Sequence, residues 1–202
     1  MDSADAPSEA QLRQRLLEIH CFPPRDDQVK AIYTLAVEQR DLILIAKTGW
    51  GKSVVFQSVS ALFPSRINIT IMPLNVLEED QAPRINDMPH CRAFVLNGKT
   101  NTLKNRHDIC DGHYTHILTG SEVILSDSFR KDILACSAFI QRVGLVAIDE
   151  LHIVEEWRST WRKEYPELCQ LRDCLPAAVP WFGTSAMLPP DLLLKVEKSA
   201  GF

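Results

Sequence analysis

The sequence predicts an α/β domain built as a three-layer sandwich, with a mostly parallel central sheet covered by helices on both sides. Two observations carry this prediction. Short runs rich in apolar and β-branched residues recur along the chain, and helical patterns separate most of them. The runs are apolar on both faces, as in the strands of a buried parallel sheet. They cover residues 42–46, 67–72, 93–97, 122–126, 143–148 and 179–185.

Two helices are expected before the first of these strands. Ser8 is a potential N-cap, and apolar residues recur at helical spacing over residues 12–19. Two consecutive prolines then interrupt the helical pattern, and residues 28–40 restore it. Residues 1–7 are predicted to be a disordered lead-in, and residues 8–202 have the length of a single domain.

The composition excludes several classes of protein. The chain is 46% hydrophobic and 24% charged, and its apolar runs are far shorter than a bilayer requires, so no membrane partner is expected. The amino terminus lacks the basic start and apolar centre of a secretory signal. Six cysteines without a C-x-x-C pair favour reduced thiols over a disulfide framework or a four-cysteine zinc site. With a net charge of −4, the chain would bind nucleic acid only in a local groove.

The loop after the first strand is predicted to bind the phosphates of a nucleotide. Gly49 and Gly51 permit the positive φ angles that turn backbone N–H groups inward, and the next helix adds its N-terminal dipole. Lys52 would contact the β- and γ-phosphates, and Ser53 would supply a hydroxyl ligand to Mg²⁺. The alternative is a glycine-rich turn without a ligand. The expected nucleotide-binding residues of the loop are Ala46, Lys47, Thr48, Gly49, Trp50, Gly51, Lys52 and Ser53.

Two positions of this loop are unusual. The full P-loop spacing requires glycine where Ala46 stands, so the sequence meets only the relaxed form of the motif. Trp50 lies between the two glycines, where its ring is expected either to face outward or to contact a base.

An acidic pair follows the fifth strand. Asp149 and Glu150 come directly after residues 143–148, at the strand end where a parallel sheet brings side chains toward its ligand. Asp149 is predicted to hold Mg²⁺, directly or through water. Glu150 is predicted to polarise the water that attacks the γ-phosphate. The alternative is a solvated acidic turn.

The sequence around this pair resembles a known family. "DELH" at 149–152 is similar to the DExH box of superfamily 2 helicases, and "DELHIVEEWRSTWRKEYPEL" resembles the RecQ family in particular. "PPRDDQ" resembles its adenine-reading element, "MPLNVLEEDQ" its single-strand contact motif, and "GTSA" at 183–186 its element that couples ATP to movement. The resemblance implies adenine contacts by Arg25 and Gln28; DNA contacts by Pro73, Leu74 and Gln81; and coupling by His152, Thr184, Ser185 and Ala186.

The resemblance also implies a fold, an activity and partners. The fold would be the first RecA-like domain of an ATP-dependent DNA helicase, with Lys52, Asp149 and Glu150 as catalytic residues and with ATP and Mg²⁺ bound. The DNA would be single-stranded, or a duplex with a single-stranded tail. The chain is expected to lack the second RecA-like domain and its arginine finger, which another chain would supply in trans. Resemblance to eukaryotic members implies a nuclear location.

The aromatic segment after the acidic pair has two interpretations. Aromatic residues recur every fourth position and alternate with basic ones, which suits a helix packed on the core. The same residues suit single-stranded DNA, whose bases stack on aromatic rings and whose phosphates bind cations. The family resemblance favours DNA binding by this segment, through Trp157, Arg158, Trp161, Arg162 and Tyr165.

One pattern in the sequence resembles a metal site. His107, Cys110, His113 and His116 recur every third residue, but such steps spread side chains around a helix, so a loop with scattered histidines is expected instead of a zinc site.

A nucleotide-responsive binding module that does not hydrolyse ATP is the alternative function. A small-molecule kinase with a P-loop is a third, although it does not explain "DELH" or "GTSA".

Overall fold

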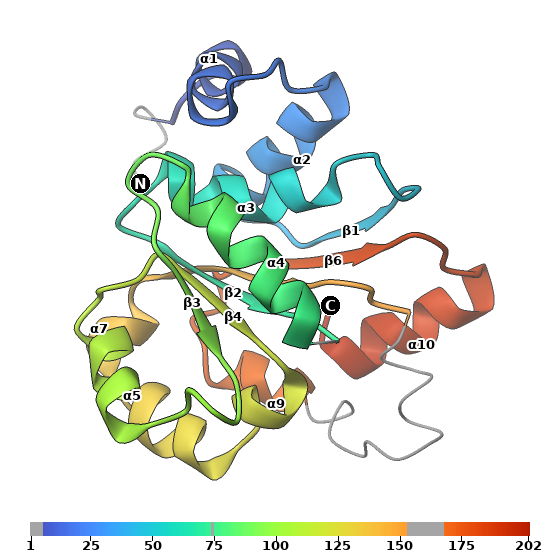
Figure 1. Ribbon diagram of the computed structural model, residues 1–202. Coiled ribbons are helices and arrows are strands. Elements are labelled where there is room, and N and C mark those ends of the chain that lie inside the picture. The colour runs from blue at the N-terminus through green and yellow to red at the C-terminus, as the bar shows by residue number, and fades with distance from the viewer. Residues whose placement is uncertain (1–5, 74, 153–167) are drawn as a thin grey trace.

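The computed structural model describes residues 6–73, 75–152 and 168–202. At its centre is a six-stranded sheet with the order β1-β6-β5-β2-β4-β3, and every neighbouring pair of strands is parallel (Figure 1). The strands are β1 (Leu42–Ile45), β2 (Ile67–Ile71), β3 (Ala93–Leu96), β4 (His116–Thr119), β5 (Val143–Ile148) and β6 (Trp181–Ser185).

Helices cover both faces of this sheet, as Figure 1 shows. On one face lie α1 (Glu9–His20), α2 (Asp26–Ala36), α3 (Lys52–Leu62) and α4 (Asn75–Asn86). On the other lie α5 (Leu103–Cys110), α6 (Ser121–Ile124), the π-helix η1 (Phe129–Ile133), α7 (Ser137–Ile140), α9 (Leu168–Asp173) and α10 (Pro190–Ala200). The predicted α/β sandwich with a parallel sheet is therefore confirmed.

Local sequence explains how the first two helices begin. Ser8 caps α1: its side chain accepts a hydrogen bond from the amide of Gln11, and the Gln11 side chain accepts one from the amide of Ser8. The chain leaves α1 through Cys21, whose φ of 57° is left-handed. The second helix begins at Asp26, two residues before the expected start, with Asp26 and Asp27 in its first turn, where the helix dipole favours acids.

The fourth predicted strand is wrong. Residues 122–126 form no strand, because Ser121–Ile124 is the short helix α6, which follows Gly120. The strand in this part of the sheet is β4, which begins six residues before the predicted strand and pairs with β2 on one side and β3 on the other. β4 is fully buried although it begins with His116, and this polar residue masked its apolar character in the sequence. The other five strands are confirmed.

His116 lies in the core as a neutral histidine. Its Nε2 donates a hydrogen bond to the carbonyl of Gln57 (2.9 Å), because a carbonyl can only accept. Its Nδ1 lies 2.9 Å from the hydroxyl of Thr115. Burial lowers the pKa of His116 to about 4 from the ordinary 6.5.

This buried histidine makes the folding stability of the chain depend on pH. The unfolded chain takes up a proton on His116 below pH 6.5, whereas the folded chain does so only near pH 4. Stability that is complete above pH 6.5 is therefore expected to fall as the pH drops from 6.5 to about 4. Urea titrations across this range should show a shallower decline for His116→Gln than for the native chain. The exposed His113→Gln is the control, and an equally shallow decline there would contradict the assignment.

The other members of the metal-like pattern are on separate elements. His107 and Cys110 lie on α5, which ends at Cys110, and His113 is exposed in the turn before β4. The expectation of a loop across these residues was wrong, because a helix and a strand contain three of the four. Within the described ranges, no group of three His, Cys, Asp or Glu side chains has the arrangement of a metal site. Over the same ranges, no helix is both long and apolar enough to span a bilayer.

Candidate functional site

The sheet order brings three sequence motifs to one edge. β6 lies between β1 and β5, and all three strands run in the same direction. Their carboxyl ends therefore present residues 46–53, 184–186 and 149–152 side by side. In parallel α/β sheets this edge is where ligands bind.

The loop after β1 has the geometry of an anion-binding cradle. Gly49 and Gly51 adopt positive φ angles of 83° and 89°, as predicted. Gly51 is the N-cap of α3 and makes no side-chain capping bond, so the helix N-terminus is open to an anion. A methyl group at Gly49 would meet no atom within 4 Å, which indicates room above the loop. Nζ of Lys52 donates to the carbonyl of Ala46 (2.8 Å) and thereby lies across the loop.

Trp50 and Gln28 attach this loop to the body of the domain. Trp50 is partly buried and packs against the apolar cluster between the sheet and α2 and α3, so its ring has a structural role. Nε2 of Gln28 lies 3.2 Å from the carbonyl of Trp50 and 3.3 Å from that of Gly51. Oε1 of Gln28 accepts from the amide of Arg25 (2.9 Å), while the Arg25 side chain is exposed. The start of α2 is thus tied to the loop.

Asp149 connects β5 to both of its neighbours. Its amide donates to the carbonyl of Ile71 at the end of β2 (2.9 Å). Its Oδ1 accepts a hydrogen bond from the hydroxyl of Thr184 on β6 (2.6 Å) and another from the amide of Glu150 (3.1 Å). Two of the predicted groups, the acidic pair and the 184–186 segment, are therefore in direct contact.

Glu150, His152 and Ser185 form a second connection. Oε2 of Glu150 lies 3.3 Å from Nδ1 of His152, and the same nitrogen is 2.9 Å from the hydroxyl of Ser185. The Ser185 hydroxyl donates its single proton to the carbonyl of Met187 (2.8 Å), so Nδ1 of His152 must carry the proton in their bond. His152 therefore lies within ion-pair distance of Glu150. The buried Oε2 of Glu150 has no partner of hydrogen-bond geometry in the described chain.

The backbone of Glu150 is unusual. Its φ of 52° lies in the left-handed region that side chains other than glycine rarely adopt. Such strain collects at functional sites, where the surrounding structure enforces it. Here the amide of Leu151 donates to the carbonyl of Thr184 (2.6 Å) and holds the turn against β6.

The predicted DNA-contact residues fall partly within the described structure. Pro73 is buried two residues after the end of β2. Gln81 lies on α4, where its Oε1 accepts a hydrogen bond from Nε2 of Gln57 on α3 (2.5 Å). Sequence reasoning missed Gln57, which joins the helix of the phosphate loop to the predicted DNA-contact helix. Leu74 lies outside the described residues, as does the aromatic segment with Trp157, Arg158, Trp161, Arg162 and Tyr165.

A cavity of about 410 Å³ adjoins the loop. It lies where the end of α1 meets the start of α3 and the end of α4, and Ser53 forms part of its wall. Phe22 lines it with a side chain that is 43% exposed and stands against His20 with a ring separation of 5.4 Å. Phe22 was not among the site residues that the sequence predicted.

Known proteins are similar to this chain in sequence. The family model for the DEAD/DEAH box helicase matches residues 25–193. A mouse protein named bifunctional 3'-5' exonuclease/ATP-dependent helicase WRN is 31% identical over 161 residues, which are 79% of this chain and 11% of that protein. The ATP-dependent DNA helicase RecQ of Pasteurella multocida is 28% identical over 141 residues, covering 69% of this chain and 21% of its own length.

Solved structures share the fold. The DUF1998 helicase MrfA, crystallised with DNA and AMPPNP, superposes with a TM-score of 0.72 at 15% identity, over 100% of this chain and 28% of its own. The Hef helicase domain of Pyrococcus furiosus gives a TM-score of 0.67 at 17% identity, over 95% of this chain and 38% of its own. Among the curated relatives compared, the chain spans between 11% and 32% of the full length.

Proposed function

Because this chain belongs to the DEAD/DEAH box helicase family and is a RecQ-like first RecA-like domain, we propose that it binds and hydrolyses Mg·ATP and contacts single-stranded DNA. The observation that carries the proposal is the contact of Asp149 with Thr184, and of His152 with Ser185, at the strand ends beside the phosphate loop. Through these contacts, a change at the groups that would hold ATP would be transmitted to β6.

The phosphate loop fits a nucleotide. The open N-terminus of α3, the left-handed Gly49 and Gly51, and the ammonium of Lys52 would together hold the phosphates. The hydroxyl of Ser53 and the carboxylate of Asp149 are oxygen ligands of the kind Mg²⁺ prefers. Bound there, the ion would neutralise charge that develops on the phosphates.

Glu150 is the proposed general base. Its buried Oε2, without a partner of hydrogen-bond geometry, is suited to accept the proton of an attacking water. With its Nδ1 proton donated to Ser185, the imidazole of His152 would stand beside that carboxylate and connect it to β6. Ala186 follows Ser185 and would complete the coupling segment.

The proposed function also implies contacts with DNA and with a second domain. Pro73, Leu74, Gln81 and the aromatic segment would contact single-stranded DNA, or the tail of a duplex. A second RecA-like domain would supply the arginine finger, either in trans or as part of a longer chain. A nuclear location is proposed from the eukaryotic relatives, such as the mouse protein.

The test is ATP hydrolysis by the purified chain with and without single-stranded DNA. Slow turnover that DNA stimulates is expected from these 202 residues alone, with no strand separation, because an arginine finger supplied by another domain is worth roughly 10³- to 10⁵-fold in rate. ATP binding without any hydrolysis would instead support the non-hydrolysing module. Transfer of phosphate to a metabolite would support a kinase.

Phe22 is proposed to stack on the nucleotide base, with Arg25 and Gln28 reading its edge. Replacing Phe22 with alanine should weaken ATP binding by about 1–3 kcal/mol, the usual contribution of one stacked base. Calorimetric titration with ATP and with inorganic tripolyphosphate separates the base from the phosphates. Binding of tripolyphosphate should be unchanged by Phe22→Ala, and an equal loss for both ligands would contradict the stacking role.

A further inference from the structure

The free edge of β1 is the starting observation. β1 pairs with β6 on one side, and the described ranges contain no strand on its other side. The amide of Ala46 donates to the carbonyl of Ser185 (3.0 Å), so Ala46, and Leu44 two residues before it, direct their backbone groups toward β6. Ile43 and Ile45 therefore direct their N–H and C=O groups outward, as a template for another strand.

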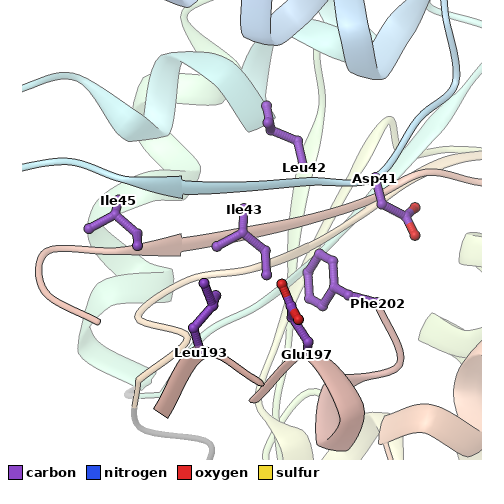
Figure 2. A pocket seen from close by; sticks show the side chains of 7 residues that line it. All are labelled: Asp41, Leu42, Ile43, Ile45, Leu193, Glu197 and Phe202. Carbon is purple, nitrogen blue, oxygen red and sulfur yellow. The ribbon is translucent and has the colours of Figure 1, made fainter. Parts of the chain in front are cut away.

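A groove lined mainly by apolar side chains, together with Asp41 and Glu197, lies beside this edge. It has a volume of about 360 Å³ and is bounded by β1, α10 and the carboxyl-terminal Phe202. Figure 2 shows Ile43 pointing from β1 toward Leu193 and Phe202. Ile45, on the same face of the strand, is 47% exposed. Leu194, which follows the groove residue Leu193 on α10, is 71% exposed. The free backbone edge and an exposed apolar surface thus coincide.

We propose that β1 pairs in antiparallel fashion with β1 of a second copy of this chain, about a two-fold axis at Leu44. In this register Ile43 of each copy lies opposite Ile45 of the other. Residues that face each other with outward backbone groups exchange both of their hydrogen bonds in an antiparallel ladder. The two sheets would join into one continuous sheet, with an isologous interface of the kind that closes a dimer.

The charges at the ends of β1 favour this register. Antiparallel pairing about Leu44 sets Asp41 of each copy opposite Lys47 of the other. The side chain of Lys47 is exposed, and Asp41 already forms an ion pair with Arg172 (2.8 Å), which fixes its carboxylate at the start of the strand. A parallel, in-register pairing would instead set Asp41 against Asp41. The inference does not depend on nucleotide chemistry, so its test needs no ATP.

Sedimentation equilibrium of the nucleotide-free chain is the first test. The native chain should dimerise reversibly, and Ile45→Lys should raise the dissociation constant about tenfold or more, because a charge blocks an edge strand. Leu103→Lys is the matched control, since Leu103 is 56% exposed on α5, and it should leave the constant unchanged. A native chain that stays monomeric at its highest attainable concentration overturns the proposal, and so does a dimer that tolerates Ile45→Lys.

A cross-link tests the register itself. Leu44 would face its own copy in a non-hydrogen-bonded pair, with Cα atoms about 4.5 Å apart, a distance at which two cysteines can form a disulfide. Leu44→Cys should give a covalent dimer under oxidised glutathione, beyond the background that the six native cysteines produce. Adding Ile45→Lys should abolish it. Failure of folded Leu44→Cys to cross-link, or a cross-link unaffected by Ile45→Lys, refutes this pairing and leaves the edge to a different partner.

Discussion

Glu150→Gln is expected to lower ATP turnover by about 10²- to 10⁴-fold while ATP binding is retained, because glutamine preserves shape but cannot accept a proton. The amide would still fit beside His152, whose Nδ1 is 3.3 Å from the native carboxylate. The turn at residue 150 keeps its left-handed backbone in this variant, so folding should be unaffected. Phosphate release under single-turnover conditions measures the rate, and a fluorescent nucleotide measures binding.

The control for this variant removes the same charge at a distance. Glu38 follows α2 at the opposite end of the strands from the phosphate loop, and Glu38→Gln should leave turnover unchanged. Turnover that survives in Glu150→Gln would assign the proton transfer to another group. Loss of nucleotide binding in that variant would mean that Glu150 holds the ligand instead of acting on water.

The sequence predicted the fold where hydrophobic patterning was unambiguous. Five strands coincide with runs rich in apolar and β-branched residues, and the alternation of these runs with helices was sufficient to indicate a parallel sheet. β4 was missed because its first residue, His116, is polar. This histidine can be buried in a strand only because the carbonyl of Gln57 on α3 accepts its hydrogen bond. That partner is 59 residues away, so no local pattern reveals it.

The sequence predicted the local geometry of the candidate site but not the tertiary hydrogen bonds between its residues. The glycine spacing of the loop predicted the positive φ angles of Gly49 and Gly51, because only the local backbone is involved. The contacts of Asp149 with Thr184 and of Gln28 with Trp50 depend on strand order and on how α2 begins. These are tertiary features, and sequence spacing alone does not contain them. The assigned roles of these residues remain predictions.

Ser185→Ala is expected to uncouple ATP hydrolysis from DNA. The hydroxyl of Ser185 is the only group on β6 within the described chain that is bonded to His152, and its loss frees the imidazole that stands beside Glu150. Nucleotide binding should be unchanged, because the phosphate loop is intact. Stimulation by single-stranded DNA should fall by roughly 5- to 150-fold, the usual range of a coupling energy between two sites, or vanish if the native factor is smaller.

A double-mutant cycle with His152→Ala shows whether the two residues act through one bond. If they do, the loss of stimulation in the double variant should equal that in either single variant, whereas independent roles would make the losses add. Ser60→Ala is the matched control, because it removes a buried hydroxyl that has no hydrogen-bond partner within the described structure. Its stimulation should equal that of the native chain. Additive losses would mean that Ser185 and His152 act independently, and an equal loss in Ser60→Ala would mean that these serines affect packing. In either case DNA signals would reach Glu150 by another path.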